Sequence, residues 1–350
     1  MSDKPALEPL PTRTRRPLPG GRHRRAGGPS LPPEAPFLVL VSPYRAEDSL
    51  PLLTELDALT RAACPGADVR LAWLEERPGA EPQVRAESQP DEGAEDTAAE
   101  RGEPAVCSLA QLLESLVDAE AEPEQQRSAV LVPLLLTADP AVQRRLAATA
   151  AAARLPVTVA EPLGPHPLLA EALHARLAEA GLARADRIRF LGVVTAADGI
   201  VVLTRGGAAA VATADATGIL LAARLAVPVI AADSAASTGA ATDVTRAVDR
   251  LREAGSTRPV LAPCLLGPEL DGDRLDKLAA AAGCERSAPL GAQQSVAQLV
   301  AVRYAAAMDR LEGLEAVAAR SGTPGSGSRR HGRAELAEPV PPPAQPPAAG

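Results

Sequence analysis

The sequence predicts an α/β protein with two similar α/β domains, each a parallel sheet flanked by helices. Short apolar runs alternate with stretches of helical periodicity along most of the 350 residues. The runs are apolar at almost every position, which is typical of parallel strands that helices cover on both faces. The second half of this alternation also repeats motifs of the first half in the same order, which indicates a duplicated unit.

Four strands and four helices are expected in the first half. The strands are short runs rich in Val, Leu and Ala at 37–41, 69–73, 129–134 and 156–160. Apolar residues at helical spacing predict helices over 49–63, 108–119, 140–153 and 167–180.

After a connection at 182–198 the same alternation starts again. Strands are expected at 200–203, 227–231, 259–263 and 284–288. Helices are expected at 215–226, 241–254, 273–282 and 292–312.

The duplication is visible in two pairs of segments. The first pair is VLVPLLL at 130–136 and VLAPCLL at 260–266. The second pair is AEPLGPHPLLAEALHARLAEA at 160–180 and SAPLGAQQSVAQLVAVRYAAA at 287–307. A duplicated α/β unit often binds its ligand in the cleft between its halves, so the cleft is the expected place for a site.

Three segments are expected to be disordered, because they cannot bury enough apolar surface to offset the entropy of ordering. They are a basic tail at 1–35, an acidic insert at 81–105 and a Pro/Gly-rich tail at 315–350. The basic tail could instead contact an acidic partner or the acidic insert of the same chain. The predicted domains are therefore 36–181 and 199–314, joined by 182–198.

Composition excludes several classes of function. Aromatic residues make up 1% of the chain, so the core is expected to be built from Ala, Leu and Val. The net charge is −8, which gives no global electrostatic case for a nucleic-acid partner. A charge-free apolar run of membrane-spanning length does not occur, and no apolar stretch follows the N-terminal arginines, so neither a membrane span nor a secretory signal is expected. The cysteines form no CxxC pair and are expected to be buried or incidental thiols of a cytoplasmic protein, at positions 64, 107, 264 and 284.

Four stretches, in order, carry a family resemblance. They read FLVLVSPYR, VRLAWLEE, VLVPLLLTADPAV and PLGPHPLLAEAL. They resemble the CbiX-type sirohydrochlorin chelatases, closely over 37–181 and more faintly over 199–312. The resemblance implies two chelatase-like α/β domains facing a cleft. It also implies a lyase that inserts cobalt or iron(II) into a sirohydrochlorin-like tetrapyrrole during cobalamin or siroheme synthesis.

The family uses three side chains for this chemistry, and the chain departs from two of them. The first family motif is Ala-His-Gly-Ser-Arg after an apolar strand, and this sequence reads SPYR, with Pro43 at the histidine position. The second motif ends Phe-Leu-Glu and is matched by WLE, which retains Glu75. The third is Gly-x-His-Val, and here DPAV places Ala141 at the histidine position. By this resemblance Glu75 is the retained catalytic position.

Losing both imidazoles removes the groups that would bind a borderline metal and accept the pyrrole protons. We therefore expect impaired or absent metal insertion, as in a pseudoenzyme. Glu75 and Asp139, with Glu47 and Asp48, could form a weak oxygen-rich metal site. Capping of helix N-termini is the preferred reading for Asp139, Glu47 and Asp48.

Two arginines end equivalent strands of the two halves. Arg45 and Arg205 are candidates to bind the carboxylates of a tetrapyrrole, the alternative being solvated loop arginines. Gly206 and Gly207 follow Arg205 without the spacing of a phosphate-binding loop, so a glycine turn is expected there.

The histidines do not replace the missing pair. His23 and His331 lie in the two tails. His166 precedes a proline at a helix start and is expected to cap or pack rather than ligate, and His174 is expected at the surface or half-buried.

Three functions follow from these observations. The first is a divergent chelatase that uses Glu75 and further, unidentified ligands. The second is a non-catalytic tetrapyrrole- or metal-binding protein, and the third is a scaffold for partner contacts. The sequence makes no prediction about the oligomeric state.

Overall fold

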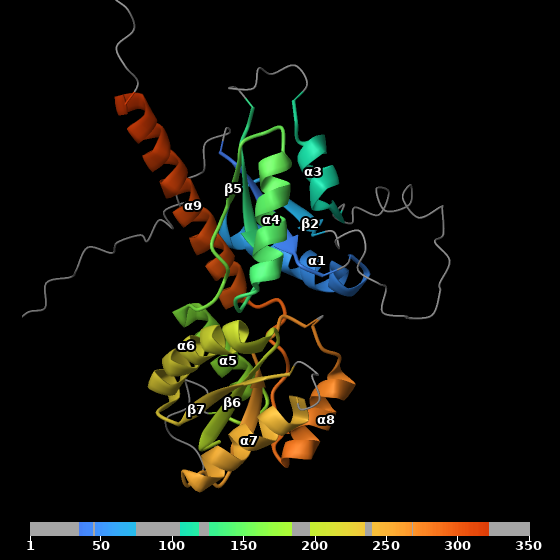
Figure 1. Cartoon of the computed structure of the whole chain (residues 1–350), viewed down its shortest axis with the longest axis vertical. Coiled ribbons are helices and arrows are strands. Elements are labelled where there is room, and N and C mark those ends of the chain that lie inside the picture. Colours follow the sequence, from blue (N-terminus) through green and yellow to red (C-terminus); the bar gives the residue numbers. More distant parts are fainter. Residues whose placement is uncertain are drawn as a thin grey trace, which may run out of the picture. The chain divides into compact units, whose positions relative to one another are not determined.

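The computed structural model describes residues 35–44, 46–74, 106–118, 126–183, 197–234, 240–267 and 269–321 (Figure 1). Within these ranges the side chains of 46–48, 240–242 and 312–321 are not described. Both sheets lie in one compact unit that ends at Asp309.

The first sheet has five parallel strands in the order β3-β2-β1-β4-β5. Its central strand is fully buried, as expected for a run that is apolar at nearly every position. Leu38 lies opposite Val69 of β2, and Phe37 lies opposite Ala129 of β4. The strands are β1 (Phe37–Ser42), β2 (Val69–Trp73), β3 (Val106–Ser108), β4 (Ala129–Pro133) and β5 (Val157–Val159).

The second sheet has four parallel strands in the order β7-β6-β8-β9. They are β6 (Gly199–Thr204), β7 (Val229–Asp233), β8 (Pro259–Pro263) and β9 (Glu285–Arg286). Leucine, valine and alanine side chains fill the space between this sheet and its helices, in keeping with the scarcity of aromatic residues.

Helices follow nearly every strand (Figure 1). They are α1 (Ala46–Ala63), α3 (Leu109–Ser115), α4 (Pro140–Ala152), α5 (Pro167–Glu179), α6 (Gly207–Leu225), α7 (Ala240–Glu253), α8 (Gly272–Ala282) and α9 (Gln294–Ser321).

The predicted internal repeat is confirmed at the level of single hydrogen bonds. Strands β6, β7, β8 and β9 are ordered as β1, β2, β4 and β5 are. At the carboxyl end of the first sheet the Leu134 amide donates to the Val41 carbonyl, and in the second the Cys264 amide donates to the Leu203 carbonyl. The positions buried along α1 and α6 also have the same spacing: 49, 53, 56, 57 and 60 in one, 210, 214, 217, 218 and 221 in the other.

Each half gives its last helix to the other half. Helix α5 packs against α6, and α9 reaches β1, where the Tyr304 hydroxyl donates to the Pro36 carbonyl (Figure 1). The exchange is reciprocal. The Arg176 guanidinium of α5 donates to the Leu290 carbonyl, and the Arg303 guanidinium of α9 donates to the Leu163 carbonyl.

Strand β3 and helix α6 differ from the expected elements for local reasons. Strand β3 is only three residues long and was not expected; Ser108, its last residue, caps α3, with Gln111 completing a capping box. Helix α6 begins at Gly207 rather than at 215, because alanines extend it backwards to the turn at Gly206. Gly206 has a φ of 127°, which confirms the expected glycine turn.

Among the described residues, α6 alone combines the length and apolar composition of a membrane-spanning helix. This is weak evidence, because core helices of globular proteins meet the same criteria. Helix α6 packs on β7 here, with Gly218 against Val229. The expectation that the chain has no membrane partner stays a prediction.

Several expectations fall outside the described residues. These are residues 1–34 of the tail predicted at 1–35, the insert at 81–105, most of the connection at 182–198 and residues 322–350 of the tail predicted at 315–350. The limit at 315 was wrong, because α9 continues to Ser321, and Ala35 is buried rather than part of a tail. The domain limits 36–181 and 199–314 stay a prediction as well.

We expect Tyr304→Phe to lower the free energy of unfolding by about 0.5–1.5 kcal/mol, because the hydrogen bond from its hydroxyl to the carbonyl of half-buried Pro36 would be lost. Tyr304 is 1% exposed and its hydroxyl lies 2.6 Å from that carbonyl oxygen. Urea unfolding measures the change, with Val302→Ala on the exposed face of the same helix as the control. Equal stability of Tyr304→Phe and the native chain would show that this contact does not fix α9 to the first sheet.

Candidate functional site

The carboxyl ends of the two sheets meet at a pair of buried threonines. Thr204 is the last residue of β6, and its hydroxyl donates to that of Thr137, which follows β4, over 3.2 Å. Nearby, the Ala138 amide donates to the Thr213 hydroxyl of α6 over 3.3 Å. The loops that follow β1, β4, β6 and β8 therefore converge on one region, where open α/β sheets place their ligands.

Ser42 organises the turn after β1. Its buried hydroxyl lies 2.8 Å from that of Ser49 in α1, and it also accepts the Tyr44 amide over 3.2 Å. This small hydrogen-bonded turn fixes where Pro43 and Tyr44 leave the strand.

The Tyr44 phenol lies among charged groups from both halves. Burial raises its pKa well above the ordinary value, Glu269 and Asp139 raise it further, and Arg205 opposes them. The phenol therefore stays protonated at neutral pH and can act as a hydrogen-bond donor or acceptor in this region.

Glu269 is a buried carboxylate in the loop after β8. Its two oxygens accept the amides of Leu266 and Gly267 over 2.9 and 2.7 Å. Burial raises its pKa, and the two amides and Arg205 act in the opposite direction. Burial and the Glu269 carboxylate together raise the pKa of Cys264 to about 12, so this thiol is protonated and unreactive.

Arg205 lies where the sequence places it, directly after β6. Its guanidinium donates to the Glu269 carbonyl over 2.5 Å, which holds the guanidinium in place while the residue remains exposed.

The carboxylate of Asp139 is occupied by capping. One of its oxygens accepts the amides of Ala141 and Val142 over 2.9 and 3.0 Å at the start of α4. Capping was the preferred reading for this residue. Ala141 itself is exposed in the first turn of α4, and Pro43 is half-buried after β1. Neither side chain has an atom that could bind a metal or accept a proton.

Four expected site residues cannot be placed in the same way. Glu75 and Arg45 lie outside the described residues, directly after Leu74 and Tyr44. The side chains of Glu47 and Asp48 are also outside the described set. Within the described part of the chain, no group of three His, Cys, Asp or Glu side chains is arranged to hold a metal ion.

The two described histidines have structural contacts. His166 caps α5, because its Nδ1 accepts a hydrogen bond from the Leu168 amide over 3.2 Å. Burial lowers the pKa of His166, and the nearby positive charge of Arg303 lowers it further. This is the capping expected of it. The expectation for His174 was wrong: it is buried, because the exchange of helices packs α5 against α6, where Arg224 donates to its Nδ1 over 2.9 Å.

The sequence reading missed Tyr44 and Glu269 as members of this region. The internal repeat could have indicated Glu269. VLAPCLL, which ends at Leu266, aligns with VLVPLLL, which ends at Leu136, so the residues after Leu266, with Glu269 among them, correspond to those after Leu136. Aligning the repeats would have placed it next to the turn that carries Tyr44.

Comparisons with known proteins agree with this architecture. The CbiX family model matches residues 94–180. The structure of SirB from Bacillus subtilis with Fe3+ aligns with a TM-score of 0.51 at 16% identity, over 80% of this chain and 98% of SirB. An extracellular ligand-binding receptor from Verminephrobacter eiseniae aligns with a TM-score of only 0.29 at 11% identity, over 71% of this chain and 60% of the receptor. No curated protein matches the sequence.

The CbiX match confirms the resemblance, and the SirB match confirms the fold class. Residues 94–180 include the motifs PLLL and PLGPHPLL, on which the resemblance partly rests. The SirB alignment extends over 80% of this chain and shows that the two proteins share their fold.

Glu269 makes stability depend on pH. Its pKa is higher in the folded chain than its ordinary value of 4.5, so folding favours the protonated form. Its contribution to stability is therefore complete below about pH 4.5 and is lost as the pH rises through the folded-state pKa.

We expect the free energy of unfolding of the native chain, relative to Glu269→Gln, to fall as the pH rises from 4.5. Urea unfolding across this range measures the difference. Glu253→Gln, at an exposed position on α7, should follow the native curve. A native-to-variant difference that is constant or grows with pH would contradict the assignment.

Proposed function

We propose that this chain, a CbiX-type chelatase family member by its matched segment and its fold, is a sirohydrochlorin chelatase-like protein with impaired metal insertion. It binds a sirohydrochlorin-like tetrapyrrole where the carboxyl ends of its two sheets meet. The observation that carries the proposal is the convergence of Tyr44, Asp139, Arg205 and Glu269 from both halves at that place.

Binding is supported by the position of Arg205. The tetrapyrrole has several carboxylates, and a guanidinium that one hydrogen bond already holds in place can bind a carboxylate with its other N–H groups at a lower entropic cost than a mobile one. Arg205 is exposed and held by the Glu269 carbonyl. Arg45, from the corresponding turn of the first half, is proposed as the second carboxylate-binding arginine.

Impaired metal insertion is supported by the chemistry of the side chains at the site. Insertion of cobalt or iron(II) requires ligands for the incoming ion and acceptors for the displaced pyrrole protons. Pro43 and Ala141 supply neither. The described carboxylates of Asp139 and Glu269 are already engaged with backbone amides. Glu75 is proposed as the retained family carboxylate, with Asp139 as a weak second ligand.

A cytoplasmic location is part of the proposal. Cys64, Cys107, Cys264 and Cys284 are all free thiols, which supports a reducing compartment.

We expect the native chain to insert Co²⁺ or Fe²⁺ into sirohydrochlorin at a rate close to the spontaneous background. Two of the three expected ligating groups are missing, and a single carboxylate cannot complete a coordination sphere. The assay follows the absorbance of the tetrapyrrole for the native chain, Glu75→Gln and the double variant Pro43→His/Ala141→His. A rate gained in the double variant supports the proposal. Native insertion well above background that Glu75→Gln abolishes would contradict impairment and establish a divergent chelatase.

We expect Arg205→Gln to weaken sirohydrochlorin binding about tenfold without metal, because one charge-assisted contact to a carboxylate is lost. An absorbance titration measures the affinity. The control is Arg154→Gln, an exposed arginine at the far end of α4. If the native chain gives no spectral or thermal response to the tetrapyrrole, a partner-binding scaffold is favoured instead.

A further inference from the structure

The two halves differ at one edge of their sheets. In the first half β3 lies along the outer side of β2, opposite Leu71–Trp73. In the second half, as far as the structure describes it, the sheet ends at β7, and the connection from β7 to α7 is only 234–239. The residues of β7 that correspond to 71–73 are Ala231–Asp233, because Ala72 pairs with Val41 as Ala232 pairs with Leu203.

The amide and carbonyl of Ala231 point away from β6, toward the open side of β7. The Ile200 amide donates to the Pro228 carbonyl and the Ser234 amide donates to the Thr204 carbonyl, so the even-numbered residues of this strand direct their hydrogen bonds to β6. Successive residues of a strand alternate in this respect, which turns the amide and carbonyl of Ala231 outward. The outward amide is held by the Asp215 carboxylate of α6, over 3.2 Å.

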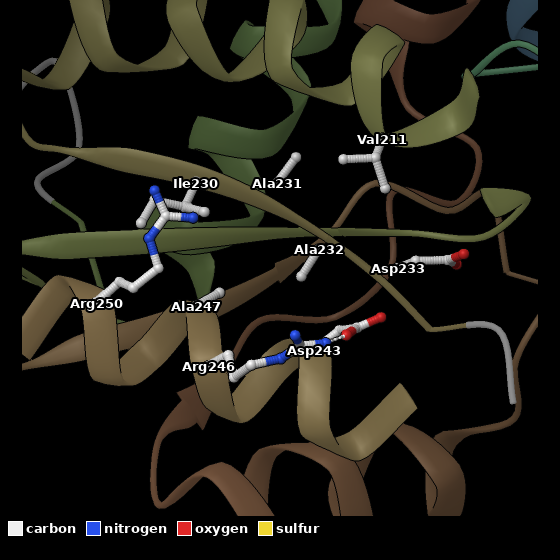
Figure 2. A pocket seen from close by; sticks show the side chains of 9 residues that line it. All are labelled: Val211, Ile230, Ala231, Ala232, Asp233, Asp243, Arg246, Ala247 and Arg250. Atoms are coloured by element: carbon white, nitrogen blue, oxygen red, sulfur yellow. Dashed lines mark hydrogen bonds and ion pairs between the residues drawn. The ribbon is translucent and has the colours of Figure 1, made fainter. Parts of the chain in front are cut away.

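Basic and acidic side chains lie at opposite ends of this edge, on the side of α7. A pocket of about 280 Å³ lies there, and Figure 2 shows Arg250 beside Ile230 at one end and Asp233 at the other, with Asp243 nearer to Asp233. Arg246 forms an ion pair with Asp243 between the two ends. The edge is thus basic near the amino end of β7 and acidic near its carboxyl end.

An exposed apolar side chain lies beside this edge on the side of α6. Ile219 is 70% exposed, whereas the other exposed large apolar side chains described, Leu50 and Val302, are 40% and 43% exposed. It lies one helical turn from Asp215, on the same face of α6, and its neighbour Gly218 contacts Val229 of β7.

We propose that the outer edge of β7 is a self-association surface, which pairs antiparallel with the same edge of a second copy around a two-fold axis at Ala231. Such a pair satisfies the outward amide and carbonyl of both strands. The antiparallel arrangement sets the basic end of one edge, with Arg250, against the acidic end of the other, with Asp243, and the symmetry makes this contact twice. The charge order therefore favours a second copy over an unrelated strand.

Asp215 limits this association. Its carboxylate competes for the Ala231 amide that the second strand needs, and the two-fold axis brings both Asp215 carboxylates close together. Charged side chains at a sheet edge are a common means of restraining the association of edge strands. Native association is therefore weak, and Asp215 sets its strength.

The first test compares the full native chain with Asp215→Ala by sedimentation equilibrium up to millimolar concentration. Asp215→Ala should lower the dimer dissociation constant at least about tenfold. Asp309→Ala, at an exposed position on α9, should leave it unchanged. Asp215→Ala that remains monomeric at the highest concentration would overturn the proposal.

The second test locates the contact in the Asp215→Ala background. Ala231→Pro removes the outward amide without affecting the pairing with β6, and should abolish dimers.

Arg250→Glu in the same background should weaken the dimers at least about tenfold, while Arg274→Glu on α8 should not. Mixing the Arg250→Glu and Asp243→Arg chains should restore association. Far-UV circular dichroism checks folding; should Ala231→Pro unfold, the charge variants decide. A dimer dissociation constant that Arg250→Glu leaves unchanged would overturn the proposal.

Discussion

The hydrogen bond between Thr204 and Thr137 is the contact on which the candidate site depends. It joins the end of β6 to the loop after β4, and the Ala138 amide adds a second link to Thr213. In parallel sheets all carboxyl ends lie along one edge, so joining two such edges brings together every loop that leaves them. The proximity of Tyr44 and Glu269 follows from this constraint and not from any closeness in sequence.

The exchange of α5 and α9 reinforces the same arrangement. Arg176 and Arg303 lie at equivalent positions of the repeat, as do the carbonyls of Leu290 and Leu163 that accept from them. Each half is therefore held by a helix whose sequence belongs to the other. The motif PLG, which is found in both halves, supplies the leucine carbonyl that accepts from the arginine of the exchanged helix in each case.

Sequence patterns predicted the fold well because parallel strands covered on both faces are apolar at nearly every position. Strand β8 has the expected limits, and β1 extends one residue further, to Ser42. The three-residue strand β3 gave no periodic signal, and the start of α6 was missed because its first turns are mostly alanine and lack large apolar residues at helical spacing. The burial of His174 depends on the helix exchange, which no local pattern encodes. The site was predicted in part: Arg205 and the capping role of Asp139 could be read locally, whereas Glu269 required the two halves to be aligned first.

The central claim is that a tetrapyrrole binds where the carboxyl ends of the two sheets meet. Hydrogen–deuterium exchange of the full chain, with and without sirohydrochlorin, tests this most directly, because it reports where the ligand slows amide exchange. The account predicts slower exchange in the segments that follow β1, β4, β6 and β8, including the amides of Leu266 and Gly267 that Glu269 accepts. Slower exchange confined to other parts of the chain, or no change at saturating tetrapyrrole, would contradict it.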